Sequence, residues 1–136
     1  MNREIKFRGK RLDNGKWVFG DLLTKHPHHK GLTIVENGVL HHEVDPKTVG
    51  QYTGLTIKGE KLFEHDRIRF RETEIEDWKH GTVAWCGKSD YPAFDVESWI
   101  DCDCNGLSHI KLNCEAEIVG NKWDTPELLE VLDDEA

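Results

Sequence analysis

The sequence predicts a mainly β protein with a hairpin-rich N-terminal part, a small barrel in its C-terminal part and a short helix at its end. Asn-Gly pairs at residues 14–15 and 37–38 each separate two apolar stretches, as in β-hairpins. Residues 62–70, 81–85 and 93–97 alternate apolar and polar side chains with the period of a half-buried strand. Short strands separated by turns are typical of a small barrel.

Length and composition agree with one small domain or two very small β units. The chain has 136 residues, of which 37% are hydrophobic, and its five Trp and five Phe can form a core. We expect an N-terminal part over residues 1–57, a barrel over 58–123, and a helix with an acidic tail over 124–136.

The first residues lack the apolar segment of a signal peptide, and no apolar run reaches the roughly 18 residues of a membrane span. We therefore expect a cytoplasmic protein whose four cysteines are thiols. The net charge of −8 opposes general binding to phosphate backbones.

The N-terminal elements follow in order. The Asn14-Gly15 hairpin joins apolar stretches around residues 5–8 and 17–19, and residues 25–31 are too rich in His, Pro and Gly to form a strand. After the second hairpin, residues 44–55 read as an ordered connector in which Asp45-Pro46 starts a turn.

In the C-terminal part we expect Ile68 and Phe70 to face the core, with Arg67, Arg69 and Arg71 in an outward row. Further inward-facing side chains are expected at Val83, Trp85, Phe94 and Val96.

Residues 72–80 are charged and predict a long exposed loop, residues 101–114 read as a variable region, and residues 115–121 as a closing strand. A terminal helix is predicted from Thr125 as N-cap and Pro126 at the first turn. Its apolar stripe would dock on the body or on a second copy of the chain, which makes a homo-oligomer one expectation.

Six segments together resemble the YopX family, small proteins encoded by phages and prophages of bacteria. The resemblance rests on Arg3 to Arg8, Val44 to Leu55, Glu64 to Arg69, Gly81 to Trp85, Glu117 to Asn121 and Asp124 to Leu129. It implies a two-part β-rich fold whose C-terminal part is like an SH3-type barrel, with no assigned activity or catalytic residue. His65 departs from the family pattern, in which Gly usually precedes the Asp, and residues 86–114 match no family motif.

Two clusters could hold a metal. Three thiolates and an imidazole can complete a zinc site, for which the candidates are Cys102, Cys104, His109 and Cys114, with Cys86 nearby. However, Cys-x-Cys is less usual than Cys-x-x-Cys, and incidental thiols in a loop are the alternative. The second hairpin could also bring the loop histidines His26, His28 and His29 near His41 and His42. Together they could form a zinc or nickel site, and the alternative is a solvated polar loop.

The outward arginine row offers a third possibility, because guanidinium groups beside aromatic rings can bind nucleic acid. The alternative is a solvated strand face paired with acids such as Glu72 and Glu74. Asp66, the conspicuous acid of this strand, is expected to cap or order a turn.

No nucleophile motif, phosphate loop or diagnostic carboxylate pair occurs, so we expect neither an enzyme nor a cofactor. The leading hypothesis is a phage or prophage accessory protein that binds a host or phage protein. The candidate partner-binding residues are Tyr52, Arg67, Arg69, Arg71, Trp78 and Trp85. A nucleic-acid-binding regulator using the arginine row, and a metal-binding protein using the Cys102 region, are the alternatives.

Overall fold

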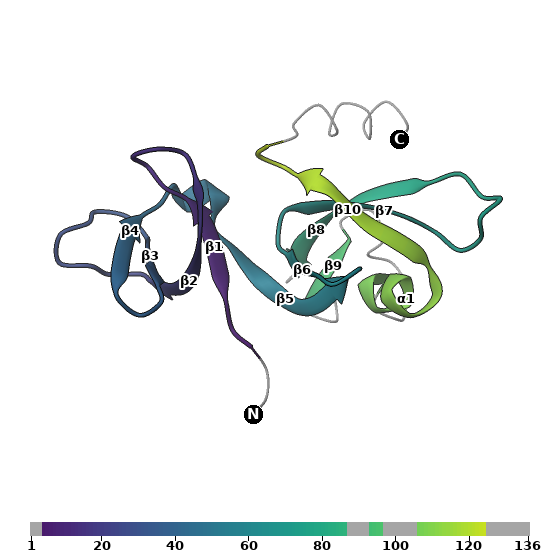
Figure 1. Cartoon of the computed structure of the whole chain (residues 1–136), viewed down its shortest axis with the longest axis horizontal. Coiled ribbons are helices and arrows are strands. Elements are labelled where there is room, and N and C mark those ends of the chain that lie inside the picture. Colours follow the sequence, from purple (N-terminus) through teal and green to yellow (C-terminus); the bar gives the residue numbers. More distant parts are fainter. Residues whose placement is uncertain (1–3, 87–92, 97–105, 125–136) are drawn as a thin grey trace. The chain divides into compact units, whose positions relative to one another are not determined.

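The computed structural model describes residues 4–86, 93–96 and 106–124, and in these residues the chain is mainly β, as predicted (Figure 1). The chain divides into two compact units, residues 1–54 and 55–136. Each unit has its own hydrophobic core. In the described part of the chain, no helix is long and apolar enough to cross a membrane.

The N-terminal unit is an antiparallel sheet built from both predicted hairpins. Its strands are β1 (Phe7–Lys10), β2 (Trp17–Leu23), β3 (Thr33–Glu36) and β4 (Leu40–Glu43), and β5 (Gly50–Ile57) pairs with β1 through its first residues. Asn37 and Gly38 both have positive φ, at 53° and 74°, as the turn between β3 and β4 requires. The first hairpin has a longer loop, closed by a hydrogen bond of 2.9 Å from Arg11 N to Lys16 O.

A small core holds this sheet together. Val18, Ile34 and Val44 are buried and pack with Phe7, Leu22, Leu32 and Val49. At Gly20 the backbones of β2 and β3 approach so closely that a Cβ atom would lie 2.1 Å from the carbonyl oxygen of Val35. Only glycine fits there.

The connector after β4 contains the predicted turn at Asp45-Pro46. The short 3-10 helix η1 (Pro46–Thr48) is capped by the Asp45 side chain, which accepts a hydrogen bond of 3.1 Å from Lys47 N. Thr48 then fixes the turn to β1, because its hydroxyl oxygen accepts a hydrogen bond of 2.8 Å from Lys10 N.

The C-terminal unit contains the end of β5, followed by β6 (Glu60–Phe63), β7 (Asp66–Arg71), β8 (Lys79–Cys86), β9 (Ala93–Val96), α1 (Gly106–Asn113) and β10 (Glu115–Asn121). Four of these strands form an antiparallel sheet in the order β10-β7-β8-β9. The predicted barrel is not closed among the described residues, because β10 and β9 remain the two edges of this sheet. The predicted C-terminal helix lies outside the described residues from residue 125 onward.

Ile68 and Phe70 face the core, as predicted. The buried side chains around them are Ile57, Leu62, Val83, Val96, Leu107, Ile110 and Ala116. Two of these come from α1, which packs against β9 and β10. No helix was predicted within residues 101–114, which were interpreted only as a variable region. Among the described side chains of α1, Leu107 and Ile110 reach the core, and two such positions are too few to give a helical pattern.

Trp85 does not face the core as expected, since its side chain is 54% exposed. Val83 lies opposite Val96 in the register of β8 and β9, and Trp85 lies opposite Phe94. The valine pair is buried in the core, whereas the aromatic pair lies two residues further along the hairpin. The alternation therefore identifies the correct face, but the core ends before it reaches Trp85.

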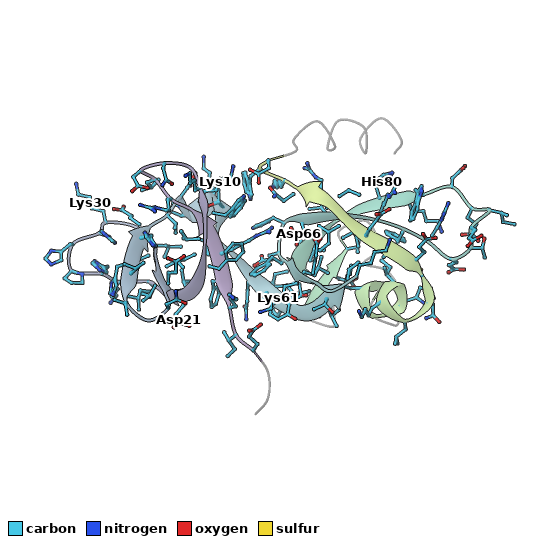
Figure 2. All side chains as sticks on the ribbon, viewed as in Figure 1. Lys10, Asp21, Lys30, Lys61, Asp66 and His80 are labelled. Atoms are coloured by element: carbon cyan, nitrogen blue, oxygen red, sulfur yellow. The ribbon has the colours of Figure 1, made fainter. Side chains whose placement is uncertain are left out.

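The turn between β6 and β7 is held by Asp66, which confirms the role expected for this acid. Asp66 is buried at the start of β7 (Figure 2), and its Oδ2 accepts a hydrogen bond of 2.8 Å from Phe63 N. His65, just before it, has a φ of 75°. Such a conformation favours glycine, in agreement with the glycine that the family resemblance implies at this position. The His65 ring instead lies edge-on to Trp123, with centroids 5.8 Å apart.

Replacing His65 tests this conformational requirement. We expect His65→Gly to be more stable than His65→Ala by about 1 kcal/mol, because both lose the Trp123 contact but only alanine keeps the penalty of positive φ. Urea denaturation measures the difference. At His80, which lies in strand β8 and has no positive φ, the order should reverse. An alanine variant as stable as the glycine variant at position 65 would contradict the prediction.

Candidate functional site

The predicted outward arginine row is only partly outward. Arg67 is 1% exposed, which corrects the expectation that it belongs to an open surface. It lies on β7, between β10 and β8, where Gly120 on one side and Thr82 on the other are its register partners. The register of β10 shifts between Ile118 and Gly120, so this end of the strand departs from simple alternation.

Arg69 and Arg71 pair with acids of the neighbouring strand rather than with Glu72 or Glu74. Arg69 Nε donates to Glu117 Oε1 at 2.6 Å, and Arg71 Nε donates to Glu115 Oε2 at 3.1 Å. The Arg69 guanidinium lowers the pKa of Glu117 below its ordinary value. The register explains the pairing, because Glu115 is opposite Arg71 and Glu117 is opposite Arg69.

Trp78 completes this arrangement. The guanidinium carbons of Arg69 and Arg71 lie 4.2 and 4.1 Å from the centroid of its ring. The arginines thus contact the ring and the carboxylates at the same time. We call Arg69, Arg71, Trp78, Glu115 and Glu117 the arginine ladder; its two positive and two negative charges leave little net field to attract a polyanion.

The remaining predicted partner-binding residues differ in accessibility. Tyr52 belongs to the N-terminal unit and is buried. Trp85 is exposed, and its ring lies 5.1 Å from that of Phe94 at an interplanar angle of 71°. Phe94 was expected to face inward, and it is partly buried and packs against the core; its contact with the exposed Trp85 was not foreseen. Its position opposite Trp85 depends on the register of β8 and β9, which a single sequence does not define.

The histidine loop does approach the second hairpin. The His26 and His29 rings stack with centroids 4.0 Å apart, and His26 Nε2 lies 3.0 Å from His41 Nδ1 on β4. His28 N donates to His26 Nδ1 at 3.0 Å, while His42 Nε2 lies 3.7 Å from Glu36 Oε1 on β3. Lys30, labelled in Figure 2, belongs to the same loop.

A hollow of about 340 Å³ opens beside these histidines and is lined by Arg11, Leu12, Asp13, His29, His41, His42 and Glu43. Reduced contact with water and the neighbouring His29, His41 and His28 rings lower the pKa of His26, while Glu43 acts in the opposite direction. The neutral form of His26 is therefore favoured.

A group of three different metal-ligating side chains occurs in the C-terminal unit. Ligand atoms of Glu72, His109 and Cys114 all lie within 4.8 Å of one another, and this is the only such group in the described part of the chain. Burial is the main cause of a raised pKa of the Cys114 thiol. His109 and Cys114 were among the predicted zinc ligands, but Glu72 was not. Cys102, Cys104 and the side chain of Cys86 lie outside the described residues.

Comparison with known families gives one match. The family model described as YopX protein matches residues 6–130, and the chain therefore belongs to the YopX family. No curated protein matches the chain.

The arginine ladder predicts a change in the titration of one carboxyl group. In Arg69→Gln, the pKa of Glu117 should rise, because its largest stabilising contact is lost. The native pairing stabilises the fold above the ordinary glutamate pKa, and this contribution is lost as the pH falls through the lowered pKa. NMR titration of the Glu117 side-chain carboxyl measures this pKa. Arg11→Gln is the matched control, because Arg11 pairs with Asp13 instead; an unchanged Glu117 pKa in Arg69→Gln would contradict the assignment.

The histidine cluster predicts a pKa change in the same direction, in a higher pH range. In His29→Ala, the pKa of His26 should rise toward about 6.5, because the stacked ring and its charge are removed. In the native chain His26 does not affect the pH dependence of stability above about pH 6.5, and protonating it destabilises the fold as the pH falls from there through the lowered pKa. NMR titration of the imidazole protons measures the shift. The control His80→Gln should leave His26 unchanged, and an equal effect of both variants would refute the cluster effect.

Proposed function

We propose that this member of the YopX family is a phage- or prophage-encoded accessory protein of the bacterial cytoplasm that binds another protein and catalyses no reaction. Family membership supports a protein without an assigned activity. The observation that carries the binding role is the exposed Trp85 ring, which lies against the partly buried Phe94; we call these two residues the aromatic pair.

The aromatic pair has the properties of a binding hot spot. Tryptophan is enriched among the residues that dominate interface energies, and its large apolar surface gains free energy when a partner covers it. The Trp85 ring already packs edge-on against the Phe94 ring, and a contact of this kind reduces the conformational entropy lost on binding. A partner that fits this surface presents an apolar pocket.

The nucleic-acid alternative has less support. Arg69 and Arg71 are paired with Glu117 and Glu115 and also contact Trp78, so binding a phosphate would require breaking charge-assisted contacts that already exist. The chain also carries a net charge of −8. We therefore place the interaction surface at the aromatic pair.

The test compares partner capture by two surface variants. The original chain, Trp85→Ala and the control Leu112→Ala are each expressed in a bacterial host. The proteins that each captures are quantified by mass spectrometry. Leu112 is 81% exposed on α1 and controls for the loss of exposed apolar surface. We expect the captured partner to be lost with Trp85→Ala and kept with Leu112→Ala.

The identified partner is then purified and its affinity measured. Trp85→Ala should weaken binding by roughly 30-fold or more, corresponding to a hot spot of about 2 kcal/mol. Phe94→Ala should weaken it less, and circular dichroism verifies that both variants fold. Equal affinities for the original chain and Trp85→Ala would overturn the surface, and catalytic turnover by the purified chain would overturn the non-enzymatic role.

A further inference from the structure

We propose that Glu72, His109 and Cys114 form a zinc-binding site in the C-terminal unit. The site is independent of the aromatic pair, since none of its ligands belongs to that surface. It also differs from the zinc site expected from the sequence, because a glutamate takes the place of the two cysteines at positions 102 and 104.

Three elements bring the ligands together. Arg71 at the end of β7 is opposite Glu115 at the start of β10, so Glu72 and Cys114 are the next residues beyond the same pair. His109 comes from α1, whose end is joined directly to Cys114 by a hydrogen bond of 3.0 Å from Cys114 N to Ile110 O. The strand register therefore sets the positions of Glu72 and Cys114, and helix α1 sets the position of His109.

The distances fit a site that closes on a metal. His109 Nε2 lies 3.1 Å from Glu72 Oε1, and all three ligand atoms lie within 4.8 Å of one another. In a tetrahedral zinc site with bonds of 2.0–2.3 Å, neighbouring ligand atoms are roughly 3.3–3.8 Å apart. Movement of the side chains by about an ångström completes the geometry, and both His109 and Glu72 have room to move because their side chains are 36% and 50% exposed.

The donor set selects the class of metal. A thiolate and an imidazole favour zinc and similar transition metals, whereas magnesium and calcium require oxygen ligands. Three protein ligands leave the fourth tetrahedral position to water, as in open zinc sites. The partial exposure of Glu72 and His109 gives that water access from solvent.

The proton balance is simple. Zinc binding releases the Cys114 thiol proton to solvent as the thiolate–zinc bond forms. The zinc ion also replaces any proton on His109 Nε2, and the neutral ring then carries its proton on Nδ1. Asn113 Nδ2 lies 3.3 Å from that Nδ1 and also donates to the His109 carbonyl oxygen at 3.3 Å.

The experiment measures metal binding by the purified full chain without a histidine tag. Zinc affinity is determined by competition with a chromophoric chelator, and cobalt is used as a spectroscopic probe. We expect one zinc per chain, no competition from excess magnesium, and a cobalt spectrum with a thiolate charge-transfer band and the strong visible absorption of tetrahedral coordination.

Matched variants identify the ligands. Cys114→Ser should abolish the charge-transfer band, and Glu72→Gln should weaken zinc binding by more than about tenfold while leaving the band in place. Circular dichroism of the metal-free variants verifies folding, and the exposed Glu72 provides a variant that leaves the core intact.

The control is the double variant Cys102→Ser/Cys104→Ser, which should bind one zinc with unchanged affinity. Loss of binding in this double variant, unchanged affinity in Cys114→Ser, or less than one zinc per original chain would each overturn the site. A cobalt spectrum without a thiolate band would also overturn it, because the metal would then have no cysteine ligand.

Discussion

The pairing of β7 with β10 is the constraint on which the C-terminal unit depends. β7 lies between β10 and β8 in the sheet order, and its inward side chains Ile68 and Phe70 contribute to the core. The same register places Glu115 and Glu117 opposite the two arginines of the ladder. It also places Glu72 beyond the end of one strand and Cys114 before the start of the other, so a shift by one residue would remove all of these contacts together.

Local features of the fold were predictable because neighbouring residues determine them. Asn37-Gly38 supplies two positive φ angles, and Asp45 caps the turn that Pro46 begins. The alternation around Ile68 also identified the buried face of β7. In each case the residue types encode the structure within a few positions of themselves.

The errors arose where distant residues decide the outcome. Alternation cannot show that Arg67 is buried, because its burial depends on which strands flank β7 and on the irregular register near Gly120. Trp85 follows the correct alternation but lies beyond the end of the core. For the candidate site, His109 and Cys114 were recognised as chemistry-bearing residues, whereas Glu72 joins them only through the pairing of strands more than 40 residues apart.

The close approach at Gly20 limits how the family can vary. Any other residue at position 20 has a Cβ atom, which would clash with the Val35 carbonyl oxygen and separate β2 from β3. Sequence drift is therefore expected at the exposed neighbours Phe19 and Asp21, while position 20 stays fixed. A glycine conserved at position 20 between two variable neighbours would reflect the selection that this backbone contact imposes.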